Sequence, residues 1–373
     1  MNLATRVAYD QNRNFDGKAF RAACYAPFTT LEFNVNGEVV ACWKSARYVL
    51  GRIGESSLDE IWKGEALRNM RTRLLNYDFP EECEWCAWQM RAGDLTDILA
   101  RRYDFLDVEP ESQWPQQFYF NLGNECNYAC IMCSGEVSSA YRKHIEGRPR
   151  KPIIYTNQFF EQLDRFLPHI RHASFFGGEP FLTPGNYRVW DRLVEINPAA
   201  RIHINTNGSV LSQRVKDYLG RLNVGSMAVS IDGATKETFE RVRRFSKYEV
   251  VMKNLEYFSC QAKALGWDFQ IVACVLRENF HELPQIYELA VRLGARVTLN
   301  MVTYPEEHSV YTLPRDERLH IHVYLHRAYT RLREQLNPAS QISYEGLLKR
   351  LSGEESWSLG PHSGSLNTTA TAI

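Results

Sequence analysis

Between residues 117 and 302, the chain alternates short apolar runs with longer amphipathic segments. The apolar runs predict strands at 118–122, 173–176, 201–205, 226–231, 269–275 and 296–302. The amphipathic segments between them predict helices at 157–167, 187–196, 212–222, 247–265 and 283–293. Such regular alternation is typical of a parallel sheet with right-handed crossover connections.

The fold class that this alternation predicts is α/β. The strand–helix units are enough for an open, partial (β/α)6 barrel, whose functional residues would lie at the carboxyl ends of the strands. An ordinary doubly wound sheet has the same periodicity and stays open as an alternative. The segments that follow the strands are therefore the first place to look for chemistry.

The residues before the alternating region predict a smaller domain of mixed α and β structure. Its elements are a hairpin of strands 30–35 and 38–42, a helix at 58–75 and a helical segment at 83–107. The hairpin turns at Asn36–Gly37, a pair that tolerates positive φ. Ser56 and Ser57 are candidate N-caps of the helix.

A polar stretch at 109–117, with prolines at 110 and 115, marks the predicted domain boundary. The predicted segments are a cysteine-rich α+β domain at 1–112, the barrel at 113–312, a helical extension at 313–352 and a tail at 353–373. The extension contains a helix predicted around 316–336. The tail is rich in Ser, Thr and Gly, and we expect it to be disordered.

Composition restricts the classes of partner. Hydrophobic residues make up 44% and charged residues 24% of the 373 residues, and the formal net charge is zero. This balance gives no reason to expect a nucleic-acid partner. The polar N-terminus lacks the apolar stretch of a signal peptide, and no apolar run is long enough to span a membrane. We therefore expect a soluble cytoplasmic protein with no membrane partner.

The chain contains nine cysteines, at positions 24, 42, 83, 86, 126, 130, 133, 260 and 274. A disulfide framework is typical of short secreted chains in oxidising compartments, and neither condition is expected here. Ligation of a metal or a cluster is therefore the favoured interpretation of the clustered cysteines.

Cys126, Cys130 and Cys133 directly follow the first strand of the alternating region. Three thiolates from one loop can hold three irons of a 4Fe–4S cubane and leave the fourth iron without a protein ligand. A three-cysteine zinc site and simple buried thiols are the alternatives. The C-x3-C-x2-C spacing resembles the signature of the radical S-adenosylmethionine (SAM) superfamily. The resemblance implies that SAM binds the open iron.

Further motifs follow the next strands in the order that this family has. Gly177-Gly178-Glu179-Pro180 resembles its GGEP segment, and Asn205–Gly208 and Ser230–Gly233 resemble its polar strand ends. In this branch an arginine after the fourth strand often lies near the SAM carboxylate. The SAM-binding residues that the resemblance implies are Gly177, Gly178, Glu179, Asn205, Asn207, Ser230, Asp232, Arg241 and Arg243.

Cys24, Cys42, Cys83 and Cys86 form a second constellation, C-x12-G-x4-C followed by C-x2-C. This arrangement, with the connector at 51–64, resembles the twitch/SPASM auxiliary domain of radical SAM proteins. The resemblance implies a second 4Fe–4S cluster, held by four thiolates. A zinc ribbon with four cysteine ligands is the alternative. Such domains usually follow the barrel, whereas this one precedes it.

The resemblance implies an enzyme that reductively cleaves SAM to a 5′-deoxyadenosyl radical and abstracts hydrogen from a substrate. A reductant such as flavodoxin or ferredoxin would supply the electron. The favoured reaction is oxidation or cross-linking of a peptide or protein side chain. A dehydrogenase or epimerase acting on a sugar or another small molecule is the alternative, and a non-catalytic zinc or iron–sulfur scaffold is a remote one. The sequence identifies no acid, base or hydrogen donor.

Overall fold

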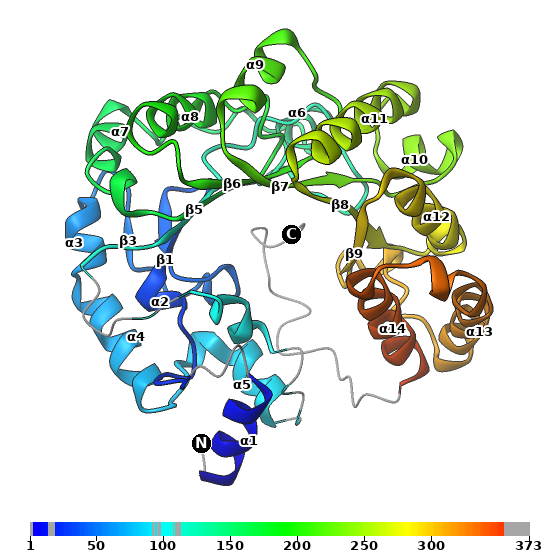
Figure 1. Ribbon diagram of the computed structural model, residues 1–373, viewed down its shortest axis with the longest axis horizontal. Coiled ribbons are helices and arrows are strands. Elements are labelled where there is room, and N and C mark those ends of the chain that lie inside the picture. The colour runs from blue at the N-terminus through cyan, green and yellow to red at the C-terminus, as the bar shows by residue number, and fades with distance from the viewer. Residues whose placement is uncertain are drawn as a thin grey trace. The chain divides into compact units, whose positions relative to one another are not determined.

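The computed structural model describes residues 3–13, 19–91, 93, 95, 98–106, 108 and 113–353 (Figure 1). The expected disordered tail lies outside the described residues, except for Gly353. The chain forms two compact units. Unit 1 consists of Met1–Leu122, Pro152–Ser174 and Asp191–Ala200, and unit 2 consists of Gly123–Lys151, Phe175–Trp190 and Arg201–Ile373. The domain limits expected from the sequence stay predictions.

Unit 2 is built on four parallel strands in chain order. They are β6 (Arg201–Thr206), β7 (Val224–Ser230), β8 (Asp268–Val275) and β9 (Arg296–Met301). Figure 1 shows α9 (Gln213–Arg221), α11 (Tyr248–Leu265) and α12 (Leu283–Leu293) along the outer side of these strands. The strands and crossover helices predicted from hydrophobic periodicity are confirmed here, and the arrangement is that of a partial α/β barrel.

In the described part of unit 2 there are four more helices, and α8 (Pro184–Ile196) begins in this unit. The four are α6 (Ser139–His144), α10 (Lys236–Val242), α13 (Arg315–Leu332) and α14 (Pro338–Ser352). The helix predicted at 316–336 is too long at its C-terminal end, because α13 ends at Leu332. Asn337 caps α14, and Pro338 occupies its first turn, where a missing N–H costs nothing.

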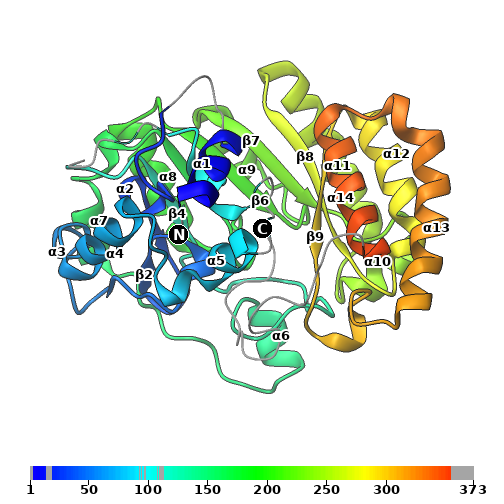
Figure 2. The ribbon, with the colours of Figure 1, turned by 90° about the horizontal axis from the view of Figure 1, so that it is seen from below.

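Helix α14 lies beside β9, the last strand of the order (Figure 2). The backbone N–H of Val297 donates to the Ser340 hydroxyl at 2.9 Å, and that of Leu299 donates to the Ser343 hydroxyl at 3.1 Å. These contacts satisfy donors that an edge strand would otherwise leave unpaired.

Unit 1 contains strands in the order β3-β2-β1-β4-β5. They are β1 (Thr30–Phe33), β2 (Glu38–Val40), β3 (Gly51–Arg52), β4 (Gln117–Phe120) and β5 (His172–Phe175), whose last residue belongs to unit 2. The predicted hairpin of β1 and β2 is confirmed. At its turn Gly37 has φ +77°, and a Cβ there would lie 2.6 Å from Ile154 Cγ2. Strand β1 also pairs in parallel with β4, which the sequence did not predict.

The helices of unit 1 are α1 (Leu3–Asn12), α2 (Ala26–Thr29), α3 (Leu58–Trp62), α4 (Glu65–Leu75), α5 (Glu84–Arg91) and α7 (Asn157–Leu163). The single helix predicted at 58–75 is wrong, because Gly64 interrupts it as the N-cap of α4. A Cβ at Gly64 would lie 2.5 Å from the Glu60 carbonyl oxygen. Ser57 caps α3 through a capping box with Glu60, as predicted for one of the two serines.

The helical segment predicted at 83–107 is also partly wrong. Helix α5 ends at Arg91, and a 3₁₀ turn occupies Leu99–Tyr103. Residues 92, 94, 96, 97 and 107 lie outside the described residues.

Candidate active site

The loop that carries Cys126, Cys130 and Cys133 is held in unit 2 by backbone hydrogen bonds. The N–H of Ala129 donates to the carbonyl of Arg244 at 3.0 Å, and that of Ile131 donates to the carbonyl of Val242 at 2.9 Å. The loop therefore pairs with the segment that ends α10.

Two serines that the sequence analysis missed hold the other side of this loop. The Ser139 hydroxyl accepts from the Cys126 N–H and donates to the Cys126 carbonyl, both at 3.1 Å. The Ser138 hydroxyl donates to the Tyr128 carbonyl at 2.6 Å and caps α6. The Ser-Ser pair at the start of a polar helix was the signal that could have indicated them.

The GGEP segment comes directly against this loop. Gly178 has φ +50°, and a Cβ there would lie 2.4 Å from the Glu125 carbonyl oxygen. That same carbonyl accepts a hydrogen bond from the Glu179 N–H at 2.6 Å. Both the backbone conformation and the close approach require glycine at 178.

Glu179 is fully buried and joins the ends of two strands of the site. Its carboxylate accepts hydrogen bonds from the Thr206 hydroxyl at 2.8 Å, the Asn207 N–H at 2.7 Å and the Phe181 N–H at 3.2 Å. Burial raises the pKa of Glu179 to about 7, although these donors act in the opposite direction. A carboxylate has about four acceptor positions, so one remains for a further donor.

The polar residues after β6 and β7 lie beside the cysteine loop. The Asn207 amide donates to Asn127 Oδ1 at 3.0 Å, and its nitrogen lies 3.8 Å from Cys126 Sγ. The Ser230 hydroxyl donates to Asn205 Oδ1 at 3.5 Å. The structure thus gathers the cysteine loop, the GGEP segment and two strand ends in one place, as the order of motifs predicts.

Asp232 and Arg243 form a buried ion pair, with 2.6 Å between Asp232 Oδ2 and Arg243 Nη2. Asp232 Oδ1 also accepts from the Cys274 N–H at 2.6 Å. Burial disfavours the Arg243 charge, but Asp232 and the neighbouring Cys130 outweigh it and raise the pKa of Arg243. Arg243 therefore presents a fixed positive charge to the cysteine loop.

Arg241 is placed differently from Arg243. Its side chain is exposed and donates to the Glu278 carbonyl at 3.0 Å. The structure does not bring Arg241 to the cysteine loop.

The three thiols of the loop are held close enough to affect one another. Burial and the neighbouring Cys130 raise the pKa of Cys126 to about 12, and burial also raises the pKa values of Cys130 and Cys133. None of the three forms a disulfide. Thiols in such surroundings lose their protons when a metal centre takes them as ligands.

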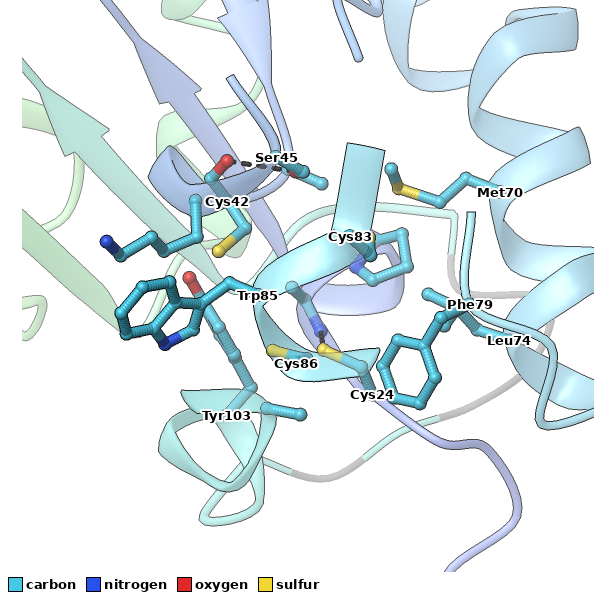
Figure 3. A pocket seen from close by; sticks show the side chains of 15 residues that line it. Cys24, Cys42, Ser45, Met70, Leu74, Phe79, Cys83, Trp85, Cys86 and Tyr103 are labelled. Carbon is cyan, nitrogen blue, oxygen red and sulfur yellow. Dashed lines mark hydrogen bonds between the residues drawn. The ribbon is translucent and has the colours of Figure 1, made fainter. Parts of the chain in front are cut away.

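Cys24, Cys42, Cys83 and Cys86 line a single pocket in unit 1 (Figure 3). Its other walls include the apolar side chains of Met70, Leu74 and Phe79, together with Trp85 and Tyr103. Burial, followed by the Cys42 charge, raises the pKa of Cys24 to about 12. Among the described residues, no three His, Cys, Asp or Glu side chains converge on a point that one metal ion could occupy. Four free soft ligands around a shared apolar space suit a multi-iron cluster.

Lys44 belongs to this pocket, and the sequence analysis missed it. Its ammonium lies 4.1 Å from the ring centre of Trp85 and 4.5 Å from that of Trp43. Burial lowers the pKa of Lys44, while Cys42 and Cys86 favour its charged form. A positive charge here stabilises the more negative, reduced form of a cluster.

We therefore expect Lys44→Met to lower the midpoint potential of the cluster in this pocket by on the order of 50 mV. A redox titration of the anaerobic protein, followed by electron paramagnetic resonance, measures this shift. Lys63→Met is the control, because Lys63 is exposed and pairs with Asp59 in the same unit. An unchanged potential in the Lys44 variant would contradict the assigned effect of its charge.

Residues 120–290 match the radical SAM superfamily, and residues 24–87 match the SPASM iron–sulfur cluster-binding domain. The chain carries a radical SAM domain preceded by a SPASM domain. These domains imply a SAM-binding 4Fe–4S cluster, an auxiliary iron–sulfur cluster and SAM as cofactors. The SPASM match favours iron–sulfur ligation over the zinc alternative.

Three curated relatives illustrate the range of this superfamily. The AdoMet-dependent heme synthase of Methanosarcina barkeri is 26% identical over 48% of this chain and 48% of its own length. The GTP 3′,8-cyclase of Ectopseudomonas mendocina is 23% identical over 56% of this chain and 57% of its own length. Mycofactocin maturase MftC of Mycobacterium tuberculosis is 24% identical over 48% of this chain and 43% of its own length. The chain thus spans about half the length of these relatives.

No helix among the described parts of the chain has the length and apolar character that crossing a membrane requires.

The radical SAM and SPASM cysteines are separable by metal analysis. We expect the intact anaerobic protein to hold about eight irons, and a variant with Cys126, Cys130 and Cys133 all replaced by alanine to keep about four. Iron, sulfide and zinc counts test this. One zinc and no iron in the triple variant, after expression with ample iron, would contradict an iron–sulfur cluster in the SPASM domain.

Proposed function

We propose that this protein is a radical SAM enzyme that uses Cys126, Cys130 and Cys133 to hold its SAM-binding cluster. The observation that carries the proposal is the meeting of this loop with Gly178 and Asn207 at the strand ends. When bound and reduced, the cluster and SAM supply methionine and a 5′-deoxyadenosyl radical, which takes a hydrogen atom from the substrate.

The residues of the chain position SAM in this proposal. Gly178 lets the backbone approach the cluster loop, and Glu179 keeps one acceptor position for the SAM ammonium. Asn205, Asn207 and Ser230 supply polar groups for the ribose and methionyl parts. Arg243, which Asp232 holds in place, offers a positive charge to the SAM carboxylate.

We assign the substrate to a peptide or protein side chain, which the enzyme would oxidise or cross-link. The SPASM domain supports this class, because its resemblance is to auxiliary-cluster proteins that commonly modify peptides. A small-molecule substrate is the second candidate, and the relatives named heme synthase and GTP cyclase favour it. A flavodoxin or ferredoxin would supply the electron in either case.

The first experiment is anaerobic incubation of the reconstituted protein with SAM and dithionite, with 5′-deoxyadenosine measured by chromatography. Release of 5′-deoxyadenosine supports the proposal, and its absence from protein with full iron content favours the non-catalytic scaffold. Added peptide libraries or small alcohols that accelerate the release then separate the two substrate classes.

A further inference from the structure

The sheet of unit 1 has one apolar and one polar face where β1 and β4 pair. Leu31 lies opposite Phe118, and Phe33 opposite Phe120, and the ring of Phe33 packs on that of Phe159 at 5.2 Å. Since side chains alternate along a strand, Glu32 and Tyr119 share the other face and lie opposite each other in the register. Gln117 belongs to this polar face, and Asn121 continues it just after β4 ends.

Three acceptors on this face have no hydrogen-bond partner among the residues that the structure describes. They are Glu32 Oε2, Gln117 Oε1 and Asn121 Oδ1. The side chains are buried, with Glu32 at 5%, Gln117 at 4% and Asn121 at 5% exposure. An unsatisfied buried polar group costs about 1–3 kcal/mol, so three on one face leave acceptor capacity that a ligand with hydrogen-bond donors would satisfy. We call Glu32, Gln117 and Asn121 the acceptor face.

The chemistry of the acceptor face selects a ligand that donates hydrogen bonds. Gln117 already uses its amide nitrogen to donate to the Tyr119 hydroxyl at 2.8 Å. Glu32 accepts from the backbone N–H of Trp43, and burial raises the pKa of Glu32 to about 8, although the Arg102 charge and this hydrogen bond act in the opposite direction. A further cation beside Glu32 would favour the ionised carboxylate, which accepts hydrogen bonds, over its protonated form.

The acceptor face adjoins the auxiliary cluster site. Tyr103 donates a hydrogen bond to the Cys42 sulfur. Burial raises the pKa of Tyr103, and so do the charges of Cys42, Tyr119 and Glu32. Tyr103 therefore lies near all three of these groups. A ligand on the acceptor face would therefore lie close to the SPASM cluster.

The spacing of the acceptors favours an extended ligand. Gln117 and Asn121 are four residues apart on a strand, which corresponds to about 13 Å. An extended peptide presents N–H groups toward one side at every second residue, at about 7 Å intervals, and so matches this span.

We propose that the acceptor face binds an extended peptide segment of the substrate, with a basic side chain on Glu32 and N–H groups on Gln117 and Asn121. The identification of this ligand as the substrate rests on the proposed function. It makes Glu32 a specificity-determining residue that selects a cationic side chain next to the auxiliary cluster.

The test is calorimetric binding to the anaerobic holoprotein in the presence of SAM. The probes are a capped pentapeptide with a central lysine and the same peptide with norleucine, which has a similar length and no charge. We expect the wild-type protein to bind the lysine peptide about tenfold or more tightly, and Glu32→Gln to lose that preference. Glu38→Gln should keep it, because Glu38 is on the same hairpin and already pairs with Arg52 and Asn34.

No lysine preference in the wild-type protein, or one that survives Glu32→Gln, overturns the proposal. Competition by n-butylammonium as strong as that of the lysine peptide overturns its peptide part and assigns the face to small amines. Release of 5′-deoxyadenosine without substrate is measured in parallel in both variants. Failure of SAM cleavage with an intact lysine preference would therefore refute the proposed function and not the binding site.

Discussion

Cys130→Ala should reduce the release of 5′-deoxyadenosine to the background of protein-free controls. The physical reason is that a cubane with two protein thiolates in place of three loses its stable site. After burial, the charge of Arg243 has the largest effect on the pKa of Cys130, and it acts to lower that pKa. Iron should fall from about eight to about four per chain.

Cys260→Ala is the control for Cys130→Ala. Cys260 is exposed on α11 and is not one of the cysteines of either constellation, so both iron content and SAM cleavage should stay unchanged. SAM cleavage by Cys130→Ala at the wild-type rate would refute the assignment of the cluster loop.

Gly178→Ala should reduce SAM cleavage by about 100-fold, because a displacement of about 1 Å in an active site has effects of that size. The new Cβ would lie 2.4 Å from the Glu125 carbonyl oxygen, and that atom belongs to the backbone next to Cys126. The overlap can be relieved only by moving the GGEP segment or the cluster loop. Measurement of 5′-deoxyadenosine release and of iron content distinguishes lost chemistry from a lost cluster.

Gly266→Ala separates this overlap from simple backbone strain. Gly266 ends α11 with φ +71°, and a Cβ there would meet no atom within 4 Å. Alanine at either position costs about 1 kcal/mol or more of stability through the positive φ alone. If both variants lost SAM cleavage equally, strain and not the contact with the cluster loop would be the cause.

Much of the barrel could be predicted from sequence because each of its strands is an apolar run between polar helices. The cysteine loop and the GGEP segment could be predicted for the same reason, since both follow such runs directly. Arg241 and Arg243 show the limit of this reasoning. They are two residues apart, yet α10 ends at Val242, and the following turn directs only Arg243 to Asp232.

Features that depend on contacts between distant segments could not be predicted. Glu32 lies in a strand that the sequence predicted, but its position opposite Tyr119 depends on the parallel pairing of β1 with β4, a strand much later in the chain. The break between α3 and α4 at Gly64 also depends on a contact within the fold, here between residues that are close in sequence. Glycine disfavours a helix interior, but a lone glycine does not by itself predict a break; the structure shows a turn so close to the Glu60 carbonyl that only glycine fits.

The hydrogen bonds that fix the cysteine loop bear on how the protein survives oxygen. The N–H groups of Ala129 and Ile131 donate to backbone carbonyls, and that of Cys126 donates to the Ser139 hydroxyl, so the protein itself supplies hydrogen bonds that hold the loop. Ordering a free loop would cost about 1–2 kcal/mol per residue each time a new cluster is inserted. In this protein that cost is met once, during folding. If oxygen removed the cluster, these hydrogen bonds would help to keep the ligands in place. We therefore expect fresh iron and sulfide to restore the cluster in the folded protein.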